Sequence, residues 1–329
     1  MSFVMRSHAL TLACLALAVA SSIEAGLQHV HAPGRVHLAM AGARPSLKHS
    51  RRAFASARFG ARAPVCSMLS DGAAPPPPAD AEPAMPVVPR FSWRLIFFFG
   101  CNPLALLPVA GVGALLKVGI GGTAFALTSQ AVLIGAAIGI PLMLFFNLPL
   151  EKLPGLSSIA EVDEASTFIT YLLFGATRGA GHFAKVITGS AIISACAGIA
   201  EELCFRGALQ TGLAMLLVNA GVAANVISYV AIFAPSVLFG YLHSYSSSPA
   251  YAIAAFVASV YFGSVYAWSG NIVVPILAHF AVDFISLVVS YVRIAYQKSD
   301  EERVAIWACN QPIARTLRYV AGYSPAPKK

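Results

Sequence analysis

Long apolar runs, separated by short polar segments, occupy most of the chain after Trp93. Runs of about 20 apolar residues can cross a bilayer as helices, and their continuous apolar character fits helices better than the alternation of a β-barrel. The sequence therefore predicts an all-α fold, a polytopic membrane helical bundle of about six to eight transmembrane helices with an intramembrane polar cavity. The predicted spans are 95–116, 123–147, 184–203, 222–242, 249–268 and 272–292.

Shorter polar and apolar segments separate these spans. Two apolar stretches, 166–177 and 208–219, are predicted as half-spans or interfacial helices, and 151–164 as the main polar loop. The Lys and Arg residues near the span ends are too sparse along the sequence to orient the bundle by the positive-inside rule.

Composition strengthens the membrane interpretation. Hydrophobic residues make up 57% of the 329 residues and charged residues 11%, against about 25% charged in a typical soluble domain. This composition argues against a soluble enzyme, a disordered protein and a nucleic-acid-binding module, and the lipid bilayer is the expected environment. The net charge of +8 resides mainly in residues 1–70, which hold eight Lys/Arg and one acid, so it says nothing about a substrate.

The first 90 residues have the composition of a targeting leader and a tether. Residues 1–25 match a signal peptide, with Arg6 before an apolar stretch, and 26–70 are rich in Arg, Ala and Ser like a transit peptide. Residues 71–90 are a Pro-rich linker. We therefore predict a transmembrane domain over 91–297, a C-terminal tail over 298–329, and a plastid membrane (envelope or thylakoid) reached through a bipartite leader. The endoplasmic reticulum or another endomembrane is the alternative.

Ionisable residues inside apolar segments mark three candidate functional clusters. Residues 207–282 contain no Asp, Glu, Lys or Arg, and a charged side chain within a span costs at least about 2.5 kcal/mol, so its presence usually marks function. The clusters are Glu201-Glu202-xxx-Arg206, Phe239-xxx-His243 and His279-xxx-Asp283.

The spacing within each cluster predicts which side chains meet. His279 and Asp283 are four residues apart and share one face of a helix, as do Glu202 and Arg206, which can pair as ions. Glu201 is left without an obvious local partner. Two histidines and two carboxylates from separate helices can converge in one polar pocket, which suits either general-base activation of water or a divalent metal.

Each cluster also has a purely structural interpretation. The Glu pair could be a solvated helix terminus, His243 an interfacial residue, and His279 with Asp283 a hydrogen-bonded pair joining two helices. The two GxxxG motifs, Gly135–Gly139 and Gly175–Gly179, predict helix packing. His182, in a Gly-rich segment, is predicted to be a structural residue of a loop.

Together the three clusters resemble the CPBP intramembrane proteases, which are related to the CAAX prenyl endopeptidases. That family carries EExxxR, FxxxH and HxxxN or HxxxD motifs in this order, and the resemblance covers about residues 165–295. It implies a helical membrane fold and peptide-bond hydrolysis. By the same likeness Glu201 is the general base and His243 helps to hold the attacking water. His279 and Asp283 stabilise the oxyanion or bind a metal, and Glu202, Arg206 and Phe239 complete and organise the site.

A metal cofactor and the substrate stay open at this stage. Asp283 stands where the prenyl endopeptidases have Asn, and a carboxylate is a better metal ligand but a poorer oxyanion donor unless it is protonated. Zinc or another divalent metal on His243, His279 and Asp283 is therefore one expectation. The expected substrate is a membrane protein or a lipidated protein. Two alternatives are a non-proteolytic membrane scaffold or chaperone of the same fold and, with less support, a transporter.

Overall fold

A computed structural model describes residues 89–115, 125–147, 159–244 and 249–309. The predicted signal peptide, transit-like segment and linker lie outside the described residues, except for the last residues of the linker. The described residues form helices and contain no strand, only an isolated antiparallel bridge between Arg90 and Gly175. Six of the helical stretches are long and apolar enough to span a membrane, so the chain is an integral membrane protein with an all-α polytopic fold.

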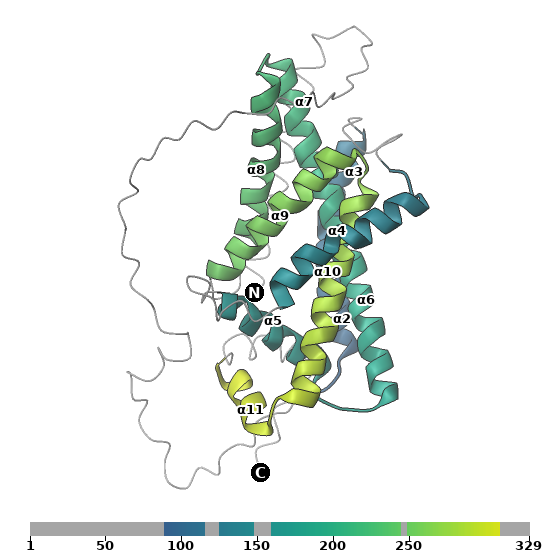
Figure 1. Ribbon diagram of the computed structural model, residues 1–329, viewed down its shortest axis with the longest axis vertical. Helices are drawn as coiled ribbons and strands as arrows, with labels where there is room; N and C mark the ends of the chain where they lie inside the picture. The colour runs from purple at the N-terminus through teal and green to yellow at the C-terminus, as the bar shows by residue number, and fades with distance from the viewer. Residues whose placement is uncertain (1–88, 116–124, 148–158, 245–248, 310–329) are drawn as a thin grey trace, which may run out of the picture.

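The spans follow the predicted order with shifted ends (Figure 1). The first consists of α2, the short η2 and α3, and the third runs without a break through α6, the π-helical η5 and α7. The stretch 208–219 is therefore part of one long span, not a separate half-span. The bounds are α2 Trp93–Cys101, η2 Pro103–Leu106, α3 Leu107–Leu115, α4 Ser129–Asn147, α5 Ile159–Phe174, α6 Ala180–Glu202, η5 Leu203–Gln210, α7 Thr211–Asn219, α8 Ala224–Leu242, α9 Pro249–Ser269, α10 Val273–Val292, η6 Arg293–Gln297 and α11 Asp300–Cys309.

The predicted polar loop is wrong over its described part. Residues 159–164 are the first turns of α5, which buries Val162 and Phe168 and leaves Glu164 exposed. Buried apolar positions and more accessible acidic positions alternate, so this segment forms an amphipathic helix. Its acidic residues gave it the composition of a loop. α5 is not among the candidate spans.

Glycines bring α10 into close contact with two neighbouring helices. A Cβ added at Gly135 of α4 would lie 2.8 Å from the Leu277 side chain, and one at Gly198 of α6 would lie 3.0 Å from the Ile276 carbonyl oxygen. Small residues allow such close backbone approach between membrane helices, which confirms the packing role of Gly135–Gly139. This fit fixes the register of α10 against α6, and both helices carry site residues.

The predicted helix-packing role of the second GxxxG motif, Gly175–Gly179, is wrong. Gly175 and Gly179 lie in the turn between α5 and α6, with φ of +67° and +120°, and their role is conformational because L-residues rarely adopt such angles. His182 lies on α6 and not in a loop. Its Nε2 is 3.0 Å from the Phe174 carbonyl oxygen and its ring stacks on Tyr291, so its role is structural as predicted.

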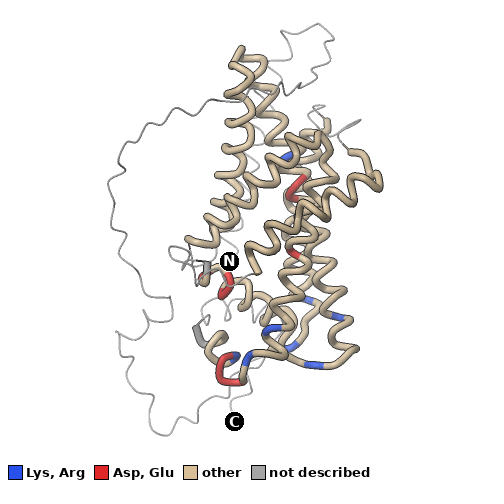
Figure 2. The backbone as a smooth tube through the Cα atoms, viewed as in Figure 1, with Lys and Arg blue, Asp and Glu red and all other residues tan. Residues whose placement is uncertain are grey.

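The end of the bundle near α11 gathers charged residues that are scattered along the sequence (Figure 2). Arg178 donates from Nε to the Ala295 carbonyl, and Arg303 donates to the carbonyls of Ile294 and Ala295. These bonds stabilise η6, whose π-helical turn leaves carbonyl groups without helical partners. Trp307 of α11 is buried against Phe168 of α5. We call this region the charged end.

Candidate active site

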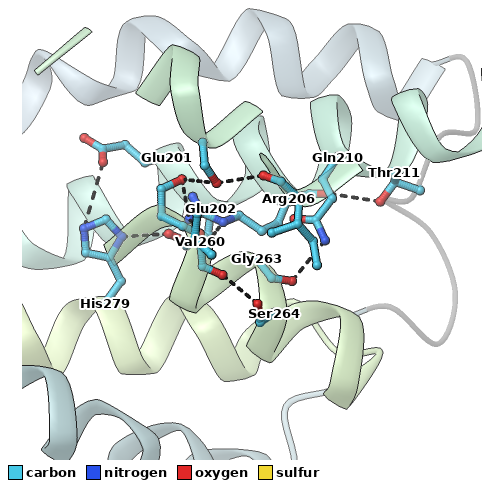
Figure 3. Close-up of polar contacts among 12 residues, drawn as sticks. Glu201, Glu202, Arg206, Gln210, Thr211, Val260, Gly263, Ser264 and His279 are labelled. Atoms are coloured by element: carbon cyan, nitrogen blue, oxygen red, sulfur yellow. Dashed lines mark hydrogen bonds and ion pairs between the residues drawn. The ribbon is translucent and has the colours of Figure 1, made fainter. Parts of the chain in front are cut away.

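The three sequence clusters meet where the end of α6, the start of η5, the end of α8 and the middle of α10 come together. Figure 3 shows Glu201 and Glu202 approaching His279 from α6, with Arg206 beyond Glu202. The close packing at Gly198, one turn before Glu202, brings α6 and α10 near enough for these side chains to touch.

His279 lies at the centre of this arrangement. Its Nδ1 is 2.8 Å from Oε1 of Glu202, and its Nε2 is 3.3 Å from Oδ2 of Asp283 and 3.9 Å from Oε2 of Glu201. An ionised carboxylate can only accept, so Nδ1–H donates to Glu202 and Nε2 faces the other two carboxylates. The predicted meeting of His279 and Asp283 on one face of the helix is confirmed.

Glu202 and Arg206 form the buried side of the site. Oε2 of Glu202 lies 3.1 Å from Nε of Arg206, and the exposed fractions of the two side chains are 0% and 1%. The predicted ion pair is confirmed. Because Arg206 stands in the π-helical η5, the helix is locally widened at this point, as often happens at functional sites.

The two neighbouring glutamates have different surroundings. Both oxygens of Glu202 face cationic or hydrogen-bond donors, whereas Glu201 keeps 12% of its side chain exposed and reaches His279 only at 3.9 Å. The imidazoles of His243 and His279 both lie within Coulombic range of Glu201. Asp283, with 37% of its side chain exposed, is the most accessible member of the group.

Phe239 and His243 form an aromatic wall from α8. The two rings stack at 4.3 Å, and Nδ1 of His243 lies 2.8 Å from the Phe239 carbonyl oxygen. Nδ1–H therefore donates to the backbone, which leaves Nε2 as the acceptor of a neutral ring. Phe239 is buried, and the Arg206 guanidinium lies over its ring at 5.5 Å. The predicted organising residue thus contacts both a catalytic candidate and the buried cation.

Sequence reasoning missed the contribution of α9. Ser259 accepts hydrogen bonds from Nη2 of Arg206 at its carbonyl and at its hydroxyl oxygen, at 2.8 and 3.0 Å. Phe262 stacks on His279 with ring centroids 4.9 Å apart. α9 has no Asp, Glu, Lys, Arg or His, so a charged residue inside a span does not mark it. Small polar residues on an apolar helix were the one available signal.

The carboxylates and imidazoles of the site are chemically suitable ligands for a divalent metal, but their side chains are not arranged around one point. Three carboxylates surround His279, and only one of them, that of Glu202, is paired with a guanidinium, so a further cation would be balanced by charge. Among the described residues, however, no group of three or more His, Cys, Asp or Glu side chains converges as metal ligands do. Glu202 holds one nitrogen of His279. As positioned, these residues do not fit a metal, and we derive no step through one.

Comparison with known proteins identifies the family. Residues 183–285 match the model of the family described as type II CAAX prenyl endopeptidase Rce1-like. This segment is similar to the CAAX endopeptidase domain. It holds all three motifs and α9, and the family resemblance predicted from the motifs is confirmed over this range. No curated protein and no solved structure matches the chain. The CAAX endopeptidase family is a family of proteases, and the domain lies within membrane-spanning helices.

Proposed function

We propose that the chain is an intramembrane endopeptidase that hydrolyses a peptide bond of a membrane-associated protein with a water activated by Glu201. The observation that carries the proposal is the unequal use of the two glutamates. Glu202 is fully buried and held by Arg206 and His279, whereas Glu201 is partly exposed and faces His279 without direct contact. A general base must have an oxygen that can reach the water.

The distance between Glu201 and His279 suits an intervening water. Oε2 and Nε2 are 3.9 Å apart, too far for a direct hydrogen bond and compatible with a bridging molecule. In the proposed step Glu201 accepts a proton from this water while its oxygen attacks the peptide carbonyl carbon. His243 accepts the other water proton in a hydrogen bond at Nε2, because its Nδ1–H donates to the Phe239 carbonyl.

The remaining residues stabilise the charge that develops. The carbonyl oxygen becomes an oxyanion. Before the reaction the single Nε2–H of protonated His279 faces Asp283, and in the proposed step this hydrogen turns to the oxyanion as its charge develops. Protonated Glu201 then transfers its proton to the leaving amine nitrogen as the C–N bond breaks. The products are a carboxylic acid and an amine, and transfer of the second water proton from the acid to the amine gives a carboxylate and an ammonium group. Glu202 and Arg206 orient His279 and do not exchange protons with the substrate.

Replacement of Glu201 by Gln tests the proposal. The amide keeps the shape of the side chain but cannot accept the proton, so activity should fall at least about 100-fold, the lower range for general acid–base catalysis. New protein N-termini are compared in membranes of cells that carry wild-type or Glu201→Gln protein at matched abundance. Glu301→Gln, an exposed acid on α11, is the control and should match wild type.

The outcome also decides between the candidate functions. Termini that appear with wild type and Glu301→Gln, but not with Glu201→Gln, identify both a protease and its membrane-protein or lipidated substrates. Unchanged termini in all strains, with Glu201→Gln rescuing a null strain, would replace the proposal by the scaffold function. The divalent metal predicted from sequence is tested by elemental analysis of purified wild type and Asp283→Ala. One equivalent of zinc lost in the variant would add a metal to the site.

A further inference from the structure

α9 carries none of the three motifs, yet it forms one wall of the site. Its Phe262 ring lies nearly parallel to the His279 ring, with an interplanar angle of 16° and centroids 4.9 Å apart. The Arg206 guanidinium lies over the same phenyl ring at 5.7 Å. Phe262 is almost completely buried, and it contacts both the central imidazole and the buried cation that orients Glu202.

Ser259, one helical turn earlier on α9, fixes the other side of Arg206. Nη2 donates to its carbonyl and to its hydroxyl oxygen, and the Ser259 hydroxyl in turn donates to Ser236 Oγ on α8 at 3.0 Å. Ser236 donates to the Ile232 carbonyl of its own helix. A continuous series of contacts therefore runs from α8 through Ser259, Arg206 and Glu202 to Nδ1 of His279.

We propose that Ser259 and Phe262 are positioning residues of the endopeptidase, which hold His279 in the orientation that directs Nε2 towards Glu201 and Asp283. Phe262 acts directly, because a stacked ring restricts rotation of the imidazole about its side-chain bonds. Ser259 acts through Arg206, whose Nε must face Glu202 for Glu202 to hold Nδ1. The proposal rests on the proposed function, and it explains why a helix without Asp, Glu, Lys, Arg or His packs so closely on the site.

Phe262→Leu separates orientation from burial. Leucine keeps an apolar side chain at this position but has no plane to stack on the imidazole. The matched control is Phe256→Leu on the same helix, since Phe256 packs against Phe233 of α8 and has no contact with His279 among those described. For the serine, Ser259→Ala is compared with Ser264→Ala, whose exposed hydroxyl donates only to the Val260 carbonyl of its own helix (Figure 3).

The kinetic experiment measures kcat and KM for full-length variants on a substrate identified from the new N-termini. We expect Phe262→Leu to lower kcat about 10- to 100-fold with KM within about 3-fold, because misplacement of a reacting group by about 1 Å costs rate rather than binding. The pH dependence of kcat should also change, since it reports the groups in the substrate complex. Ser259→Ala should lower kcat less, Phe262→Tyr should restore most of it, and both control variants should match wild type.

A second measurement does not depend on activity. The ring ¹⁵N signals of His279, assigned by comparison with His279→Gln, report which nitrogen carries hydrogen. We expect Phe262→Leu and Ser259→Ala to shift these signals and Phe256→Leu to leave them unchanged. Unchanged signals, or unchanged kcat and pH profile in both α9 variants while Glu201→Gln is inactive, would overturn the positioning roles. If wild-type protein lacks activity while Phe262→Leu and Ser259→Ala still shift the His279 signals, the result would contradict the proposed function alone.

Discussion

The intramembrane site and the charged end contain the same type of ion pair, an arginine with a carboxylate, but the pair is buried in the site and exposed at the charged end. In the site, Glu202 and Arg206 have exposed side-chain fractions of 0% and 1%. At the charged end, Arg293 and Asp163 pair at 3.1 Å with 30% and 43% of their side chains exposed, and Arg303 pairs with Asp300, which is 90% exposed. Distance alone therefore does not distinguish the two regions, whereas access of solvent does.

Burial determines what such a pair can do. An exposed pair exchanges its contacts with water and contributes little to stability, about 0–1 kcal/mol. A buried pair has lost its hydration, so each member depends on its partner, and the geometry of the pair becomes rigid. The site uses this rigidity to hold His279, while the charged end ties α5, η6 and α11 to the bundle.

Loss of one member of the buried pair should have the largest effect. Glu202→Ala leaves Arg206 buried without its carboxylate and Nδ1 of His279 without its acceptor, so we expect a loss of about 3–5 kcal/mol in the free energy of unfolding. The measurement is denaturant-induced unfolding of the purified protein in mixed micelles.

Removal of both charges provides the control. In Glu202→Met with Arg206→Met, no uncompensated charge remains, and replacement of a buried pair by apolar side chains is often close to neutral for stability. The double variant should therefore recover at least half of the loss caused by Glu202→Met alone. A double variant as unstable as the sum of the two single variants would show that the pair is not the source of the effect.

The charged residues of the site could be predicted from the sequence, whereas the residues of α9 that pack against them could not. Glu202 with Arg206 and His279 with Asp283 follow from helical spacing and the cost of charge in a membrane, and the six spans follow from hydropathy. Ser259 and Phe262 could not be predicted, because apolar and small polar side chains on a spanning helix look the same whether they face lipid or a site. The cations of the charged end are too far apart in sequence to be counted together, and only the packing of η6 and α11 assembles them.

The exposed pair provides the contrasting case. Asp163→Asn should lower the free energy of unfolding by less than about 1 kcal/mol, since Arg293 also donates to the Asn147 carbonyl oxygen. High salt screens exposed charges, so the difference between wild type and Asp163→Asn should shrink as salt is added, whereas that for Glu202→Ala should not. Equal losses for Asp163→Asn and Glu202→Ala would refute the comparison between the two regions.

The smallest expected effect on stability comes from the titration of single carboxyl groups at the charged end, outside the spans. Partial loss of contact with water, together with the charges of Glu161 and Asp163, raises the pKa of Glu164 above its ordinary value of 4.5. The folded protein therefore binds the Glu164 proton more tightly than the unfolded chain does. Its contribution to stability is present at acidic pH and is lost as the pH rises through the raised pKa. Glu164→Gln should thus be slightly more stable than wild type near neutral pH, and this advantage should disappear on acidification.

Glu301 on α11 provides a control of opposite sign. Hydrogen bonds to the backbone and to Ser299 lower its pKa, so its contribution is present at neutral pH and is lost as the pH falls below the ordinary value. Thermal unfolding midpoints of wild type, Glu164→Gln and Glu301→Gln are measured between about pH 2.5 and about pH 7.5, which spans both titrations. The two difference curves should have opposite signs at neutral pH and converge on wild type in acid. Curves of the same sign would contradict the opposite pKa shifts of the two carboxyl groups and the different surroundings from which those shifts arise.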